Sequence, residues 1–242
     1  MGRSVLKGLP HRSTWCSVTA ISGPDTMHVI YGGTFDPIHH GHLRLALEVS
    51  EALEVSRVHL VPSHIPPHRG STGASSAQRL EMIRQAIAGE PALALDEQEV
   101  HRGGASYTAD TLRQLRAELG PDCPLVMVVG TDAFSSFDRW REWQEIPGLA
   151  HIVVVRRPGS ELPVGSEAAQ LVAERCVGSA SELHSRPAGL VLELAPPLLD
   201  ISATGIRRRI AAGRSPRYLT PDDVCQSIRA WGLYGARPVE GQ

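Results

Sequence analysis

The sequence is poor in cysteine and has no long apolar stretch. Its cysteines form no C-x-x-C pair, which predicts neither a zinc site nor a disulfide framework, and we expect reduced thiols at Cys16, Cys123, Cys176 and Cys225. No apolar run approaches the roughly 20 residues that span a bilayer, and residues 1–26 lack the apolar core of a signal peptide. These absences predict a cytoplasmic protein without a membrane partner.

The chain also lacks an excess of basic charge. Its 24 lysines and arginines are matched by 26 acidic residues, which gives a net charge of −2. A broad nucleic-acid-binding face needs clustered basic charge, so we expect no nucleic-acid partner, whereas a small anionic ligand needs only a local cluster. Lys7 is the only lysine, so the basic groups of a binding site must be arginines. The composition leaves a homo-oligomer open.

Short β-rich runs alternate with helical patterns along most of the 242 residues. This alternation is typical of βαβ units and predicts one α/β domain with a Rossmann-like, doubly wound parallel sheet. The predicted strands are 28–32, 57–62, 92–96, 125–130, 151–155 and 190–194. The predicted helices are 41–54, 78–88, 109–119 and 167–175, followed by a small C-terminal helical part at 203–212 and 221–231. Thr220 is expected to cap the last helix, with Pro221 at its first position.

The ordered chain is predicted to begin at Met27. Residues 1–26 show no core-forming pattern and are interpreted as a disordered N-terminal extension, or as a start-site artefact with Met27 as the initiator. The domain is expected to span residues 27–235, followed by a tail at 236–242. Within the domain, residues 156–187 are rich in Gly, Ser, Glu and Pro and predict a variable connection with one surface helix.

One segment concentrates groups that suit phosphate chemistry. It follows the first strand and reads Gly32-Gly33-Thr34-Phe35-Asp36-Pro37-Ile38-His39-His40-Gly41-His42. In open α/β sheets, ligands bind at the carboxyl ends of strands, which is where this segment lies. Gly32 and Gly33 are expected to turn the backbone tightly and let it approach a phosphate. His39 and His42 are expected to present their rings on one face of a helix start, with room left by Gly41, and to donate hydrogen bonds to nucleotide phosphates.

Each part of this segment has an ordinary explanation when it is taken alone. A Gly-Gly pair after a strand is most often a turn, and a single histidine is most often a surface or core residue. Zinc is disfavoured because the spacing of His39 and His42 differs from that of an H-E-x-x-H site and no Glu lies between them. We therefore predict no metal ligands from the protein, and it is the combination of features that favours function.

The segment resembles the G-x-F-x-P-x-H-x-G-H signature of the H-x-G-H nucleotidyltransferase superfamily. Its Gly-Gly-Thr-Phe-Asp-Pro form is most similar to bacterial nicotinate-nucleotide adenylyltransferases. The resemblance implies transfer of AMP from ATP to nicotinate mononucleotide, with release of pyrophosphate, in NAD biosynthesis. It also implies that His39 and His42 are catalytic and stabilise the pentavalent α-phosphate. The same resemblance assigns part of the ATP phosphate site to Gly32, Gly33, Thr34 and Gly41.

Two further segments resemble the ATP site of this family. Residues 201–207 are similar to its I-S-x-T-x-I-R motif, which implies that Ser202, Thr204 and Arg207 bind the ATP phosphates. From the residues alone, Ser202 or Thr204 would cap an ordinary basic helix, with Arg207 one turn in. Residues 130–132 are similar to the family's G-x-D, which implies that Asp132 contacts the ATP ribose beside Gly130.

Four residues are candidates for binding nicotinate mononucleotide. Arg69 lies in a loop that resembles one where the family often has Lys, so it is either a phosphate contact or a solvent-facing loop arginine. Thr108 lies in a segment similar to S-Y-T-x-D-T-L, at a helix N-terminus that would receive the nicotinate carboxylate. Trp140 is the candidate to stack on the pyridine ring, whereas Trp143 is expected in the core. Arg157 is a candidate phosphate contact.

The resemblance implies an in-line attack of the mononucleotide phosphate on the α-phosphorus of ATP. Because this acceptor is already an anionic nucleophile, catalysis needs positioning and charge stabilisation but no covalent enzyme intermediate. Mg²⁺ would be held mainly by the ATP phosphates and by water.

Other functions are also compatible with parts of the sequence. They are an adenylyltransferase for nicotinamide mononucleotide or phosphopantetheine, a cytidylyltransferase, and a non-catalytic nucleotide-binding regulator. The S-Y-T-x-D-T-L segment and the region of Trp140 disfavour phosphopantetheine and a cytidylyltransferase, whereas residue types leave the choice between nicotinate and nicotinamide mononucleotide open. A regulator would not need His39, His42, Ser202 and Arg207 all intact. A ligase related to aminoacyl-tRNA synthetases would need a lysine-rich second motif, which this chain lacks.

Overall fold

The computed structural model describes residues 27–66, 72–157, 159 and 161–236. The predicted extension at 1–26, Arg69 and all of the predicted tail except its first residue lie outside these ranges, so the domain bounds 27–235 stay a prediction. Among the described residues, no helix is both long and apolar enough to cross a membrane.

Seven parallel strands form one sheet in the order β3-β2-β1-β4-β5-β7-β6 within the described part of the chain. They are β1 (His28–Gly33), β2 (Val58–Pro62), β3 (Leu93–Leu95), β4 (Leu125–Gly130), β5 (His151–Val155), β6 (Cys176–Val177) and β7 (Val191–Leu194). The chain builds outward from β1 to β3, then returns to the other side of β1 and builds outward again from β4. This reversal between β1 and β4 is the point at which doubly wound sheets bind ligands.

Helices on the two faces of the sheet are α1 (His40–Ala52), α2 (Ser76–Ala86), α4 (Thr108–Leu119) and α7 (Glu167–Arg175), and α8 (Ala203–Ala211) and α9 (Asp222–Ala230) lie beyond one end of it. Three shorter helices are α3 (Gln98–Arg102), α5 (Thr131–Phe134) and α6 (Ile146–Leu149). Short 3₁₀-helices are η1 (Phe137–Arg139), η2 (Trp143–Glu145), η3 (Ala180–Ser185) and η4 (Leu233–Gly235).

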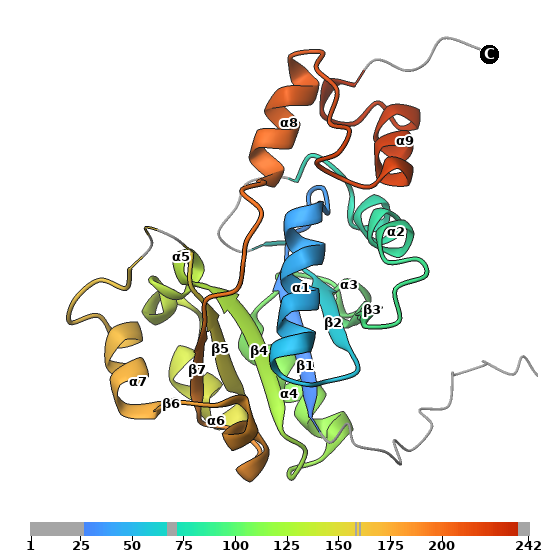
Figure 1. Cartoon of the computed structure of the whole chain (residues 1–242). Coiled ribbons are helices and arrows are strands. Elements are labelled where there is room, and N and C mark those ends of the chain that lie inside the picture. Colours follow the sequence, from blue (N-terminus) through green and yellow to red (C-terminus); the bar gives the residue numbers. More distant parts are fainter. Residues whose placement is uncertain (1–26, 67–71, 158, 160, 237–242) are drawn as a thin grey trace, which may run out of the picture.

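The alternation of strand side chains divides the core into two apolar layers. In β4, Val126 and Val128 belong to the apolar layer that also contains residues of α1, α2, α8 and α9. Their neighbours Met127 and Val129 point to the other face and pack with residues of α4, α6 and α7. Figure 1 shows α8 and α9 together at one end of the molecule, beside α2. The predicted doubly wound α/β fold with a small C-terminal helical part is confirmed.

The predicted element bounds need a few corrections. Thr220 is not the cap of the last helix, because its Oγ1 donates to the Ile38 carbonyl (2.7 Å), and Pro221 takes the N-cap position before Asp222. α2 begins two residues earlier than expected because Ser75 and Gln78 form a reciprocal capping box. The helix expected at 167–175 is present, but β6 in the same connection was missed, since two residues carry no periodic signal.

Candidate active site

A cavity of about 400 Å³ lies at the carboxyl ends of β1 and β4. Eight of the residues predicted from the sequence line it, namely Gly32, Gly33, Thr34, Thr108, Gly130, Asp132, Trp140 and Arg157. A larger cavity of about 1280 Å³ lies beside the first residues of β1 and β2, but none of the predicted site residues lines it. The cavity at the carboxyl ends of β1 and β4 is therefore the candidate active site.

The two glycines do not form the tight turn that was expected of them. Gly32 and Gly33 end β1, where they pair with Val61 and Pro62, and the residue with left-handed backbone is Phe35 (φ 49°). A Cβ added to Gly33 would lie 2.8 Å from the Phe35 ring, whereas one added to Gly32 would meet nothing within 4 Å. Gly33 is thus needed for packing, and Gly32 leaves main chain open to the cavity.

His39 and His42 present their rings on one face of the start of α1, as predicted. His39 is the N-cap, and its Nδ1 accepts a hydrogen bond from the His42 N–H (3.3 Å). The two rings stack with centroids 3.6 Å apart and an interplanar angle of 20°. A Cβ at Gly41 would lie 3.0 Å from His39 Nδ1 and 3.3 Å from the Ile201 carbonyl oxygen, so Gly41 is required for this packing.

The environment of His39 fixes its protonation state. The side chain is only 4% exposed, and burial lowers its pKa to about 4, with further lowering by the charges of Arg157 and His40. The ring is therefore neutral at pH 7. Because Nδ1 accepts a hydrogen bond, the single ring proton is assigned to Nε2, and His39 is a neutral Nε2–H donor.

Asp36 connects the loop between β1 and α1 to two distant segments. Its Oδ2 accepts from the Gly73 N–H (2.8 Å), and its Oδ1 accepts from the Tyr234 hydroxyl (2.7 Å). The Asp36 carbonyl accepts from Arg207 Nη1 (2.7 Å), which holds α8 against this loop. These contacts bring the two phosphate motifs together although they lie far apart in the sequence.

The second motif forms the start of α8. Ser202 is its N-cap and accepts from the Gly205 N–H (3.1 Å). Thr204 lies inside the helix, so of the two predicted caps only Ser202 is used, and Thr204 Oγ1 instead accepts from Arg207 Nη2 (3.3 Å). Six predicted residues thus do not line the cavity and lie at the starts of α1 and α8: His39, Gly41, His42, Ser202, Thr204 and Arg207.

The cavity lining also includes Trp140 and Thr108, two of the residues predicted to bind the acceptor. Trp140 lines the cavity and also packs on Phe137 with ring centroids 5.5 Å apart. Trp143 packs on the same phenylalanine (5.7 Å) but does not line the cavity. Both tryptophans are half-buried against the same apolar layer, so Trp143 is not the core residue that was expected. Thr108 is the first residue of α4, and its N-cap Tyr107 makes no side-chain capping bond.

Asp132 and Arg157 meet at the edge of the cavity. Arg157 Nη1 donates to Asp132 Oδ2 at 3.1 Å, and both side chains are more than half exposed. In this structure the two residues predicted to bind ribose and phosphate therefore pair with each other. An exposed pair of this kind is weak and can be exchanged for ligand contacts at little cost.

The cytidylyltransferase-like family model matches residues 30–209 of the chain. A "probable nicotinate-nucleotide adenylyltransferase" of Cellvibrio japonicus is 49% identical over 205 residues, covering 85% of this chain and 97% of the relative. A relative of the same name from Halorhodospira halophila is 47% identical over 206 residues, covering 85% and 94%. The chain belongs to the nicotinate-nucleotide adenylyltransferase family. This confirms the family that the sequence motifs resembled.

A solved structure with the same fold is the Plasmodium falciparum nicotinic acid mononucleotide adenylyltransferase complexed with NaAD. It aligns with a TM-score of 0.65 at 16% identity and covers 85% of this chain and 96% of that one. The fold of this nicotinate-nucleotide adenylyltransferase family member is thus shared with a far more distant protein.

Arg79 was not predicted from the sequence as a site residue. It is fully buried beside the loop between β1 and α1. Its Nη1 donates to the Thr34 carbonyl (2.8 Å) and its Nη2 to the His64 carbonyl (2.9 Å), so it holds together the loops that follow β1 and β2. Burial lowers the pKa of this guanidinium. The sequence contains one signal, because Arg79 falls on the apolar face of α2 with Met82 and Ile83.

Glu99 of α3 was also missed. It lines the cavity, is 8% exposed, and accepts hydrogen bonds from the hydroxyls of Thr111 (2.6 Å) and Ser106. Burial raises the pKa of its carboxyl group. The Ser106 hydroxyl in turn accepts from the His64 N–H (2.8 Å), so Glu99 anchors the segment that leads into α4.

Proposed function

We propose that the protein transfers AMP from ATP to nicotinate mononucleotide, which yields nicotinate adenine dinucleotide and pyrophosphate. The observation that carries the proposal is that one cavity is lined both by residues predicted to bind ATP, Thr34 and Gly130, and by residues predicted to bind the acceptor, Thr108 and Trp140. A nucleotide bound at the carboxyl ends of β1 and β4 would place its phosphates between these two groups of residues. The names of the curated relatives support the same reaction.

The phosphate side supplies charge stabilisation. The neutral His39 Nε2–H donates to the α-phosphate of ATP as negative charge builds there, and His42 acts from the ring stacked on it. The N-terminus of α8, with Ser202 and Arg207, binds the outer phosphates, which suits a helix start and a guanidinium. Because the acceptor phosphate is itself the nucleophile, its attack on the α-phosphorus needs no enzyme nucleophile.

Mg²⁺ is proposed to bind together with ATP. The described residues include no cluster of three or more His, Cys, Asp or Glu side chains able to hold a metal ion. Mg²⁺ commonly binds through substrate phosphates and keeps several waters, so it needs no protein cage. When bound, the ion would neutralise the pyrophosphate leaving group, while Asp132 would contact the ribose and Arg157 the acceptor phosphate.

The acceptor side favours a carboxylate on the pyridine ring. The first N–H groups of α4 have no side-chain cap from Tyr107, so the helix start near Thr108 offers donors and a positive dipole end. Trp140 provides a flat face for the ring. In the structures compared by fold, the Plasmodium falciparum enzyme was complexed with NaAD, the product expected here.

One observation favours a second acceptor. The Glu99 carboxylate in the same cavity would accept a hydrogen bond from the amide of nicotinamide mononucleotide and would repel a carboxylate. Its two hydroxyl donors reduce this repulsion, so we keep nicotinate as the proposed substrate.

The test is an assay of pyrophosphate release by the full chain with ATP and Mg²⁺. Nicotinate mononucleotide, nicotinamide mononucleotide and phosphopantetheine are supplied in turn. We expect kcat/KM for nicotinate mononucleotide to exceed that for the amide by about 100-fold, as for a site built around a charge-assisted hydrogen bond. Equal use of acid and amide contradicts the carboxylate site at α4, and release with phosphopantetheine alone contradicts the proposed acceptor.

A further inference from the structure

We propose that Arg113 is a positioning residue that holds the two parts of the acceptor side together. The inference rests on the proposed function, because these parts are Thr108 at the start of α4 and Trp140 after η1. Contact with Phe137 fixes Trp140 from the core. Of the residues that follow Trp140, Trp143 packs on the same phenylalanine, whereas the charged side chains of Arg141, Glu142 and Glu145 contact residues at the start of α4.

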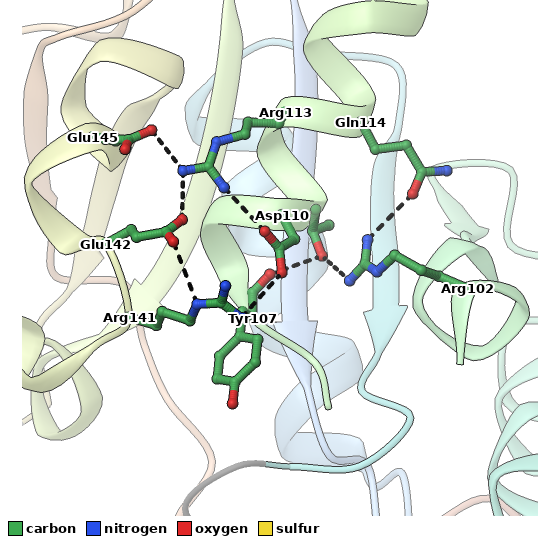
Figure 2. A network of polar contacts seen from close by, with 9 residues as sticks. Arg102, Tyr107, Asp110, Arg113, Gln114, Arg141, Glu142 and Glu145 are labelled. Atoms are coloured by element: carbon green, nitrogen blue, oxygen red, sulfur yellow. Dashed lines mark hydrogen bonds and ion pairs between the residues drawn. The ribbon is translucent and has the colours of Figure 1, made fainter. Parts of the chain in front are cut away.

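The guanidinium of Arg113 lies at the centre of these contacts, as Figure 2 shows. Arg113 Nη1 donates to Asp110 Oδ1 on its own helix (3.0 Å). Its Nη2 donates to Glu142 Oε2 (2.5 Å) and to Glu145 Oε2 (2.6 Å). Both glutamates lie just after Trp140 in the sequence, so these bonds tie the tryptophan segment to α4.

Arg141 makes a second connection at the same place. Its guanidinium carbon lies 4.6 Å from the centre of the Tyr107 ring, and its Nε lies 3.3 Å from Glu142 Oε1. Its Nη1 is 3.9 Å from Asp110 Oδ2. Asp110 and Glu142 therefore each contact both arginines, and the four charges form a closed ring around the junction (Figure 2). Isolated exposed ion pairs contribute little, but a closed network restricts all of its members at once.

The backbone of Glu142 shows that this junction is constrained. Its φ of 56° and ψ of 35° are left-handed, which is unfavourable for a residue with a side chain and persists only where surrounding contacts hold it. The hydrogen bond from Arg113 keeps the pKa of the Glu142 carboxyl below its usual range, so the group stays charged at neutral pH. Without Arg113, the turn that follows Trp140 loses its two hydrogen bonds to α4 through Glu142 and Glu145.

The test is the steady-state kinetics of Arg113→Met. We expect KM for nicotinate mononucleotide to rise about 10-fold, with kcat and KM for ATP within about two-fold, because ring stacking contributes equally to the ground and transition states. Arg113→Lys keeps the charge and should recover part of the affinity. The control is Arg44→Met, since Arg44 is another helical arginine that pairs with carboxylates, but its partners Glu48 and Glu51 both lie on its own helix.

A double-mutant cycle separates positioning of Trp140 from a general effect on stability. In a Trp140→Ala background, Arg113→Met should change KM for nicotinate mononucleotide by less than about two-fold, because both changes remove the same contact. A full second 10-fold increase overturns the inference. A wild-type enzyme that uses nicotinate mononucleotide, together with an unchanged KM in Arg113→Met, also overturns it but leaves the proposed function intact. A wild-type enzyme that does not use this acceptor overturns both.

Discussion

His39 has two roles that a matched pair of substitutions can separate. Its Nδ1 caps α1 by accepting from the His42 N–H, and its Nε2–H is the proposed donor to the α-phosphate. Asparagine is among the best N-cap residues, so His39→Asn keeps the cap and removes the donor. His39→Ala removes both.

The two variants should differ in stability and agree in activity. Loss of the N-cap costs about 1 kcal/mol, and loss of the stacked contact with His42 costs about 0.5–1.5 kcal/mol. His39→Ala bears both losses, so it should be about 1 kcal/mol less stable than His39→Asn. Both variants lose a preorganised donor, which should lower kcat by about 100- to 1000-fold.

Urea unfolding and the rate of pyrophosphate release measure the two effects. A kcat for His39→Asn within about ten-fold of the wild type would show that Nε2–H does not stabilise the transition state. Equal stability of the two variants would show that Nδ1 does not cap the helix. Because the pKa of His39 is about 4, the wild-type kcat should also show no ionisation of this residue between pH 6 and 8.

Four further outcomes are expected. His42→Ala should lower kcat by about 100-fold and leave the Kd for ATP within a few fold. Trp140→Ala should raise KM for both pyridine mononucleotides by similar factors, whereas Trp143→Ala, which removes a core contact, should mainly lower Tm. Burial lowers the pKa of His59 to about 3, so the unfolded chain binds its proton below pH 6.5 and the folded protein does not. The free energy of unfolding should therefore fall as the pH drops below 6.5. Urea unfolding of His59→Gln should show a smaller decrease over the same pH range than the wild type. Deletion of residues 1–25 should leave Tm and kcat unchanged, and a large loss of Tm would show that this segment packs on the domain.

The sheet was predictable from the sequence because its signals are local. β4 and β5 are continuous apolar runs between turn residues, and α1 and α4 show one apolar face each, so their type and order follow from periodicity. β6 has two residues and α3 has five, so neither is long enough to show a periodic pattern in the sequence. Their formation depends on tertiary contacts. Thr220 failed as a cap because a distant acceptor, the Ile38 carbonyl, takes its hydroxyl.

The candidate site was predictable where its residues form contiguous motifs. His39 and His42 lie in one short segment, and their shared face follows from helical spacing. Arg79 and Glu99 were missed because their function depends on partners in other loops, such as Thr34 and Ser106. Sequence spacing specifies neither the burial of these charges nor their hydrogen bonds.

The most direct test of the central claim follows the phosphorus atoms of ATP. Wild-type protein is incubated with Mg²⁺, nicotinate mononucleotide and ATP that is radiolabelled at either its α- or its γ-phosphorus. The α label should appear in nicotinate adenine dinucleotide and the γ label in pyrophosphate, in equal amounts, and His39→Asn should slow both together. An α label recovered only as AMP, or a γ label recovered as inorganic phosphate, would contradict transfer of AMP to the pyridine mononucleotide.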